Sequence, residues 1–151
     1  YLADSFQHTG ISHNQNLRYI NVVDHLAMDL DKGISLHALK MEHKVPCWGY
    51  SLEDGSRKLV FVTDTRSNAN TVRLAQKADI LIHEATFQHH DREKAMEHFH
   101  VTEMQAMEIA DAAQVKRLIL THFSPRLTDD DVKEWIWRGQ PCAVFDKRQG
   151  I

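Results

Sequence analysis

The chain has 151 residues, of which 42% are hydrophobic and 26% are charged, and its net charge is −3. The length is that of one domain with a substantial core, and the composition is that of an ordinary soluble protein. A mildly acidic chain is not typical of bulk nucleic-acid binding. No apolar run approaches the roughly 18–20 residues that cross a bilayer, so we expect no membrane partner.

Cysteine and histidine counts indicate the setting and the chemistry. Two cysteines, Cys47 and Cys142, are too few for a disulfide framework and favour a reducing, cytoplasmic setting. Histidine is in excess, with 11 of 151 residues. Because histidine is the commonest metal ligand, the excess favours a metal site without locating it.

The predicted strands begin at residue 34. Residues 1–33 carry weak periodicity, and we expect an irregular segment with one short helix near residues 22–30. Beyond it, apolar and polar residues alternate, and Asp54-Gly55 is a hairpin signal between two apolar runs. We predict strands near residues 34–42, 46–52, 58–63, 79–83, 117–121 and 142–145.

Helical patterns alternate with these strands from residue 58 onward. The clearest helix has Thr102 as its candidate N-cap, and Gly139 closes the last one. We predict helices near residues 68–77, 102–113 and 128–138, with a short helix or helical turn at 91–99. Residues 34–151 are therefore expected to form an α/β domain, with a mixed sheet and helices on one side.

Residues able to bind metal follow four of the predicted strands. His43, Asp64, Glu84 and His122 each stand at or just after a strand end, and His100 precedes the clearest helix. Ligands gather at the carboxyl ends of strands in layered α/β folds. Zn²⁺ takes imidazole nitrogen and carboxylate oxygen, and two such ions suit the displacement of a phosphate ester.

Each of these residues also has a structural interpretation. His43 alone would suit a surface position at a strand end, and Asp64 could cap the segment that follows it. His83 lies within a buried strand and is expected to be structural. His89, His90 and His98 are expected to be solvated loop histidines.

Four co-linear motifs carry a family resemblance. "FVTDT", "DILIHEATF", "HFHVTEMQA" and "LILTHFSPR" occur in this order, and "HKVPCWGY" precedes them. Together they resemble the C-terminal half of ribonuclease Z, the tRNA 3′ endonuclease of the metallo-β-lactamase superfamily. The resemblance implies half of an αββα sandwich, two zinc ions in the complete site, a tRNA precursor as substrate and a homodimer of the complete enzyme.

The same resemblance implies residue roles. His43 and His122 would each bind one zinc ion, and Asp64 would bridge the two. His100 would donate the proton to the leaving oxygen, supported by Glu84. Two further residues, Ser124 and Arg126, would contact the phosphate, which suits a hydroxyl and a guanidinium.

The chain departs from the family pattern in two ways. No H-x-H-x-D-H segment precedes His43, so we expect an incomplete site and a missing N-terminal half or a second chain to complete it. The interval between His43 and Asp64 holds only a short turn, where bacterial tRNA-processing members often carry a basic arm. "TDT" also replaces the more usual "GDT".

These departures leave three hypotheses open. The first is a zinc-dependent endoribonuclease of the ribonuclease Z type that is inactive as this chain alone. The second keeps the fold but takes a small phosphodiester, sulfate ester or lactone as substrate. The third is a non-catalytic half-domain that pairs with another chain.

Overall fold

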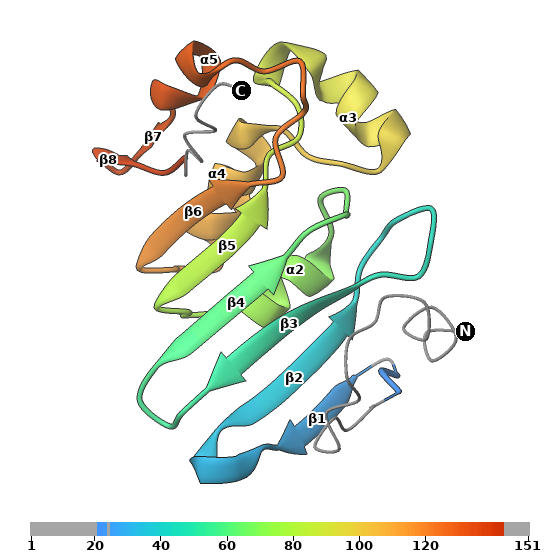
Figure 1. Cartoon of the computed structure of the whole chain (residues 1–151), viewed down its shortest axis with the longest axis vertical. Coiled ribbons are helices and arrows are strands. Elements are labelled where there is room, and N and C mark those ends of the chain that lie inside the picture. The colour runs from blue at the N-terminus through green and yellow to red at the C-terminus, as the bar shows by residue number, and fades with distance from the viewer. Residues whose placement is uncertain (1–20, 24, 144–151) are drawn as a thin grey trace, which may run out of the picture.

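A six-stranded mixed sheet forms the centre of the computed structural model, which describes residues 21–23 and 25–143 (Figure 1). Its strands lie in the order in which they occur along the chain. They are β1 (Leu26–Asp29), β2 (Ser35–Lys40), β3 (Trp48–Glu53), β4 (Lys58–Val62), β5 (Ile80–Glu84) and β6 (Arg117–Thr121). The α/β class and the mixed sheet predicted from the sequence are confirmed.

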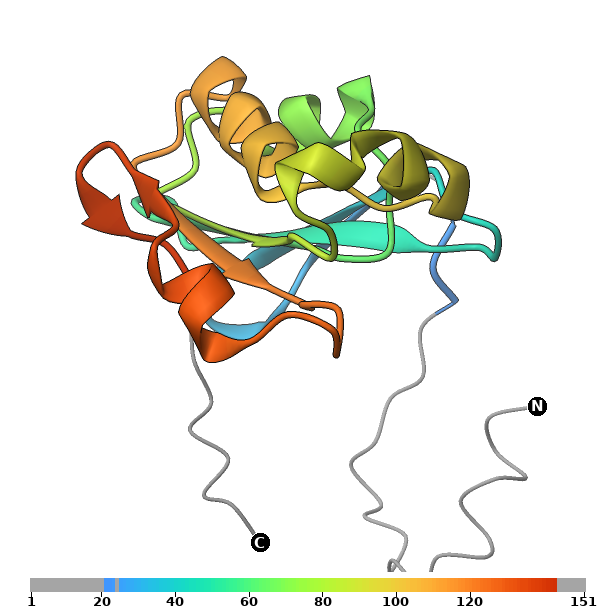
Figure 2. The same cartoon turned by 90° about the horizontal axis from the view of Figure 1, so that it is seen from above.

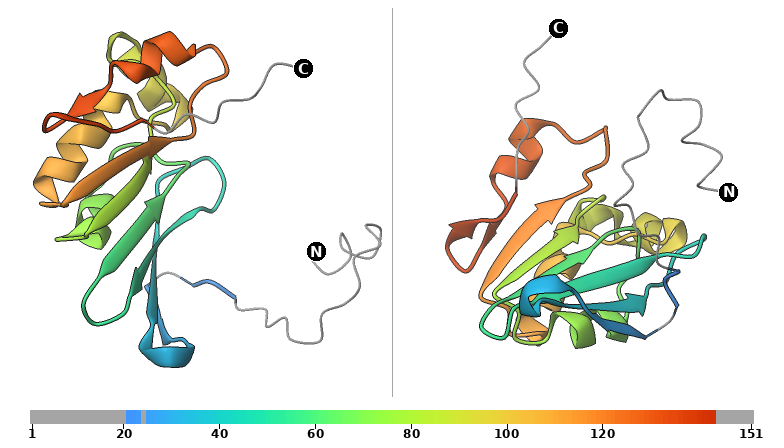
Figure 3. Two further views of the ribbon diagram at one scale, coloured as in Figure 1. Left: turned by 60° about the vertical axis from the view of Figure 1, so that its left-hand side comes forward. Right: turned by 60° about the horizontal axis from the view of Figure 1, so that its bottom comes forward.

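Strand direction brings four chain segments to one edge of the sheet. β1 to β4 pair antiparallel in succession, whereas β4, β5 and β6 pair parallel. β2, β4, β5 and β6 therefore run in the same direction, and their carboxyl ends lie at the same edge (Figures 1 and 3). The residues that follow these four strands are those that the sequence singled out.

The turn between β3 and β4 is short and internally bonded. The Asp54 carboxylate accepts hydrogen bonds from the backbone N–H groups of Ser56 (3.1 Å) and Arg57 (2.8 Å), and Gly55 has a φ of 83°. A side chain is strained at such a φ, which explains the glycine. The predicted hairpin is confirmed.

Helices cover one face of the sheet (Figure 2). These are α2 (Ala69–Ala75), α3 (Arg92–His98) and α4 (Glu103–Ala112), with the short 3₁₀ turns η1 (Asp31–Gly33) and η2 (His89–Asp91) elsewhere in the chain. Thr102 caps α4 through a reciprocal capping box with Gln105, as its position predicted. Buried side chains of the strands, such as Val60, Val62 and Leu81, pack under these helices.

The other face of the sheet exposes large apolar side chains. Leu52, Leu59 and Phe61 are 39%, 36% and 44% exposed, whereas the alternate residues Val60 and Val62 are fully buried. Leu52 pairs with Leu59 across β3 and β4, so these side chains are neighbours on one face. We call these three residues the open face. An exposed apolar face of this kind is the one expected of half a sandwich.

Two predictions at the ends of the chain are wrong. Residues 26–29 form the edge strand β1, although a short helix was expected near 22–30, because all four residues pair antiparallel with β2. The helix predicted at 128–138 ends early. It is α5 (Asp129–Lys133), followed by a hairpin of β7 (Ile136–Trp137) and β8 (Gln140–Pro141).

The reason for the early end lies in the packing of tryptophans. Trp135 and Trp137 are both buried in the core. An extended chain can place these two residues there, and α5 therefore ends before them. α5 and the hairpin lie beside the β6 end of the sheet, apart from the layer of α2, α3 and α4 (Figures 1 and 2). Of the strand predicted at 142–145, the described part shows a single bridge between Leu120 and Ala143, and residues 144–145 lie outside the description.

Both cysteines are free thiols, in agreement with the absence of a disulfide framework in the sequence. No helix in the described ranges is long and apolar enough to cross a membrane. Most of the predicted irregular segment, residues 1–20, lies outside the residues that the structure describes.

Candidate metal centre

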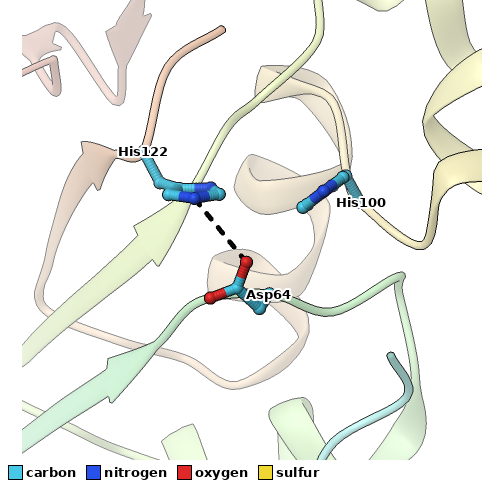
Figure 4. A group of neighbouring side chains, drawn as sticks. All are labelled: Asp64, His100 and His122. Carbon is cyan, nitrogen blue, oxygen red and sulfur yellow. Dashed lines mark ion pairs between the residues drawn. The ribbon is translucent and has the colours of Figure 1, made fainter. Parts of the chain in front are cut away.

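Three side chains from three loops converge at the carboxyl edge of the sheet (Figure 4). Asp64 follows β4, His122 follows β6, and His100 lies in the connection between α3 and α4. One ligand atom from each of the three lies within 4.8 Å of the others. Nε2 of His122 is 3.6 Å from Oδ1 of Asp64.

Backbone strain accompanies this convergence. Asp64 and His122 have φ angles of 53° and 55°, in the left-handed region that side chains other than glycine rarely adopt. The chain therefore leaves the extended conformation at each residue, just after β4 and β6. Strained conformations of this kind concentrate at functional sites.

A buried carboxylate supports His100. Oε2 of Glu84 lies 2.9 Å from Nδ1 of His100, and the Glu84 side chain is fully buried. Its other oxygen accepts a hydrogen bond from the backbone N–H of Thr65 at 2.6 Å. Nδ1 of His100 is thus occupied, and Nε2 is the nitrogen left for the site.

The two groups shift each other's pKa in opposite directions. Burial raises the pKa of Glu84, but hydrogen bonds from His100, Thr65 and Thr86 outweigh it and hold the pKa below its ordinary value. The hydrogen bond to Glu84 raises the pKa of His100 above its ordinary value, and partial burial opposes it. An ionised carboxylate therefore stands behind a histidine that retains a proton more readily than a free imidazole.

His43 lies next to the three-residue group and outside it. Its ring centroid is 5.3 Å from that of His100, and the His100 ring is 5.5 Å from that of His122. Nδ1 of His43 is 3.3 Å from the carbonyl oxygen of Phe99. The His100 ring is thus a neighbour of both other imidazoles.

The loop that carries His43 is fastened to the same connection. Arg66 stacks over the Phe99 ring, with 4.8 Å from the guanidinium carbon to the ring centroid, and its Nε is 2.6 Å from Glu42. These contacts hold the end of β2 against the residue before His100.

The remaining candidates lie in the turn after His122. The backbone N–H of Ser124 donates to the carbonyl of Thr86 at 3.2 Å, and the Ser124 hydroxyl accepts from the backbone N–H of Arg126 at 3.3 Å. Arg126 is exposed. His83 is fully buried and His89, His90 and His98 are exposed, as expected. The three exposed histidines lie in η2 and α3 and not in loops, so that part of the expectation is wrong.

Sequence reasoning missed Thr86. Its hydroxyl lies 2.7 Å from Oε2 of Glu84 and 3.0 Å from Nδ1 of His122. The available signal was its place two residues after Glu84, at the end of the same strand. This signal is weak, because threonine is a poor metal ligand and is common in strands.

The donor set fits a zinc ion in kind. Two imidazole nitrogens and one carboxylate oxygen are ligands that Zn²⁺ accepts, and about four donors, or three and a water, complete its coordination. The Asp64 and His122 side chains are 41% and 43% exposed, so the group faces open space on one side. Ligands from outside the described residues have room to approach.

Comparisons with known proteins agree with this geometry. The family described as "Beta-lactamase superfamily domain" matches residues 1–123. The chain belongs to this family. Within it, the chain is related to ribonuclease Z, and the ribonuclease Z of Picosynechococcus sp. is 52% identical over 97 residues, which cover 60% of this chain and 29% of that protein.

Other relatives show the same partial coverage. The ribonuclease Z of Synechocystis sp. is 32% identical over 146 residues, covering 64% of this chain and 45% of that protein. The crystal structure of human tRNase Z, short form, aligns with a TM-score of 0.62 at 35% identity, over 66% of this chain and 39% of that one. The chain thus spans less than half the length of these relatives.

A further structure supports the fold alone. The metallo-beta-lactamase fold protein YhfI from Bacillus subtilis aligns with a TM-score of 0.69 at 23% identity, over 85% of this chain and 52% of that one. The six-stranded sheet with its helices is therefore part of a metallo-β-lactamase fold, as the motifs implied.

Proposed function

We propose that this chain is the C-terminal half of a zinc-dependent phosphodiesterase of the ribonuclease Z type, which cleaves tRNA precursors at the 3′ end. The observation that carries the proposal is the buried Glu84 bonded to His100, beside Asp64 and His122 at one sheet edge. A carboxylate–histidine pair next to a metal-binding group suits the hydrolysis of a phosphodiester.

The metal-binding residues of this proposal are Asp64, one histidine before it in the sequence and one after it. We assign zinc binding to His43, Asp64 and His122, which would together hold the two ions of the complete site. When bound, the ions supply electrostatic stabilisation of the charge that develops on the phosphoryl oxygens. The 3.6 Å approach of His122 Nε2 to Asp64 supports a shared site for these two residues.

His100 has the properties of a proton donor to the leaving oxygen. Nδ1 is bonded to Glu84, so Nε2 carries the transferable proton. The raised pKa keeps His100 protonated closer to neutral pH than a free imidazole would be. A proton donor is most effective when its pKa lies near the working pH, and the hydrogen bond to Glu84 shifts the pKa of His100 upward from its ordinary value.

The turn after His122 is suited to holding the phosphate. The Ser124 backbone is fixed by its bond to Thr86, and the exposed Arg126 follows two residues later. A guanidinium can bind two phosphate oxygens at once, which a lysine cannot do with the same geometry.

The proposal requires a second half. The three assigned donors, His43, Asp64 and His122, do not fill two zinc sites. The open face of Leu52, Leu59 and Phe61 is also large and apolar for a solvent-facing surface. A missing N-terminal half or a second chain that packs on this face would supply the remaining ligands. The complete enzyme would then be a homodimer, as the family resemblance implies.

One observation favours a second candidate function. The chain between His43 and Asp64 consists of a short loop, β3, a four-residue turn that Asp54 stabilises, and β4. A basic arm that would hold tRNA is not present in this interval. The alternative is a hydrolase of the same fold that takes a small phosphodiester, sulfate ester or lactone.

The test is an activity comparison on the complete protein, or on this chain supplied with its missing half. We expect cleavage of a tRNA precursor to be preferred over a chromogenic phosphodiester, and the reverse preference would support the small-substrate function. His100→Ala should lower turnover by about 10²–10⁴-fold with unchanged zinc content. The matched control is His98→Ala, which removes an exposed histidine of α3 and should leave turnover unchanged.

A further inference from the structure

Thr86 is held in place by its backbone. It follows β5, where the N–H of the preceding Ala85 donates to the carbonyl of Thr121 at 2.9 Å. Its own carbonyl accepts from the N–H of Ser124 at 3.2 Å. The chain on both sides of Thr86 is thus bonded to the end of β6 and the turn after it, so the side chain can be changed without removing these bonds.

The Thr86 hydroxyl has more polar neighbours than it has hydrogens. It lies 2.7 Å from Oε2 of Glu84, 3.0 Å from Nδ1 of His122, 3.0 Å from the carbonyl oxygen of His122 and 3.5 Å from Nδ1 of His100. A hydroxyl has one hydrogen to donate and two lone pairs that accept. The hydroxyl can therefore donate in only one of these contacts, and a ring nitrogen that stays bonded to it must donate to a lone pair of the hydroxyl oxygen.

The carboxylate takes the hydroxyl hydrogen. Glu84 is ionised, an ionised carboxylate only accepts, and its contact is the shortest of the four. The neutral carbonyl of His122 is a weaker acceptor at a longer distance. The hydroxyl lone pairs then remain for the ring of His122, so Nδ1 of that ring must carry the hydrogen that joins them.

This assignment fixes which nitrogen of His122 reaches the site. With the hydrogen on Nδ1, the lone pair of Nε2 is free, and Nε2 is the atom that lies 3.6 Å from Asp64. Outer hydrogen bonds that hold a histidine ring in one tautomer orient it for a metal ion. The buried carboxylate of Glu84 thus acts on His100 directly and on His122 through Thr86.

We propose that Thr86 is a positioning residue that relays Glu84 to His122 and holds this ring as the Nδ1–H tautomer, with Nε2 presented to the metal. The metal part of the statement rests on the proposed function. The tautomer part concerns the chain alone and does not depend on it.

The first measurement therefore needs no metal. Nitrogen-15 NMR of the imidazoles distinguishes the two neutral tautomers, at a pH well above the ordinary imidazole value of about 6.5. We expect His122 of the metal-free chain to be Nδ1–H in the wild type and in Thr86→Ser. In Thr86→Val, which keeps the shape and removes the hydroxyl, His122 should move to the Nε2–H form, whereas His100 should stay Nδ1–H because it contacts Glu84 directly.

The second measurement is zinc affinity by competition with a chelator. Loss of the hydrogen-bond partner of a metal-binding histidine lowers metal affinity by about 10–100-fold. We expect this loss for Thr86→Val and not for Thr86→Ser. Thr121→Val is the matched control, since its hydroxyl bonds to neither histidine ring among the described residues. If the valine variant does not fold, Thr86→Ala removes the same hydroxyl without the branched side chain.

The outcomes separate the two levels of the proposal. An unchanged His122 tautomer in the variants without the hydroxyl would overturn the role of Thr86, whatever the zinc result. A changed tautomer in a chain that binds no zinc in any context would leave that role standing and count against the proposed function.

Discussion

Oε2 of Glu84 lies 2.9 Å from Nδ1 of His100, and the carboxylate that makes this contact is fully buried. A buried ionised carboxylate is costly unless its hydrogen bonds are satisfied, and here Thr65, Thr86 and His100 satisfy them. The arrangement fixes one nitrogen of His100 and leaves the other for chemistry. The first prediction follows from this pair.

Glu84→Gln should lower the pKa of His100, because the hydrogen bond to the carboxylate is the main cause of its elevation. A raised pKa in the folded state stabilises the protein below the unfolded value of about 6.5, and this contribution is lost as pH rises through the folded value. The stability difference between wild type and variant should therefore be larger at pH values below 6.5 than well above it.

The measurement is an NMR titration of the His100 ring, with urea unfolding at the two ends of the range. Glu108→Gln is the control, since Glu108 is an exposed carboxylate that pairs with Arg92 at 3.9 Å. Identical His100 titrations in the wild type and in Glu84→Gln would contradict the assignment.

His83 should make the protein sensitive to acid. Burial lowers its pKa, and its Nε2 is buried without a hydrogen-bond partner in the described part of the chain. A depressed pKa gives stability that is present above the unfolded value of about 6.5 and is lost as pH falls below it. In His83→Gln, which cannot titrate, the loss of unfolding free energy on acidification should be shallower.

Urea unfolding at a series of pH values tests this, with the exposed His89→Gln as the comparison. Parallel stability curves for wild type and His83→Gln would show that the buried imidazole has no part in the acid response.

The strained backbone at His122 predicts that a glycine variant at this position is more stable than an alanine variant. Its φ is 55°, where a side chain costs about 1–2 kcal/mol and glycine costs nothing. Both His122→Gly and His122→Ala remove the imidazole, yet the glycine variant should be about 1 kcal/mol more stable. At Thr121, inside β6, the order should reverse, because glycine weakens a strand by about 0.5–1 kcal/mol.

Denaturant unfolding of the four variants gives the comparison. An alanine variant at position 122 that matches or exceeds the glycine variant would mean that the left-handed conformation there carries no strain.

The two faces of β4 should respond differently to a charge. Val60 is fully buried under the helices, and Phe61, its neighbour, is 44% exposed on the open face. Val60→Glu should unfold the chain, because an unpaired buried carboxylate costs several kcal/mol. Phe61→Glu should change the unfolding free energy by less than about 1 kcal/mol and reduce both self-association and the binding of an apolar dye.

Circular dichroism and sedimentation measure these effects on the isolated chain. Equal destabilisation by the two substitutions would show that the face of Phe61 is already covered.

The sequence predicted most of the sheet because strand signals are local. The alternation in β2, β3 and β4 and the Asp54-Gly55 turn depend on neighbours along the chain, and they were found within a few residues of their bounds. β1 was missed because its pairing with β2, rather than its own sequence, makes it a strand. The early end of α5 was missed because the buried positions of Trp135 and Trp137 are tertiary facts.

The sequence could predict which strand ends carry residues of the candidate site. Asp64 and His122 each follow a buried apolar run in the sequence. Because β4, β5 and β6 are parallel, both residues lie at the same edge of the sheet. The sequence could not show that His100 rather than His43 joins them within 4.8 Å, because this depends on the loop between α3 and α4. It also could not show the contact of Thr86 with His122, which arises from the pairing of β5 and β6.

Zinc content is the most direct test of the central claim that this chain holds part of a zinc site that a second half completes. His43, Asp64 and His122 offer three donors to two ions, so mass spectrometry of the purified chain should find fewer than two zinc ions, weakly held. Addition of the missing half should bring the content to two as phosphodiester cleavage appears, and His122→Ala should lose metal first. Two tightly held zinc ions on the isolated chain, with full turnover, would contradict the account.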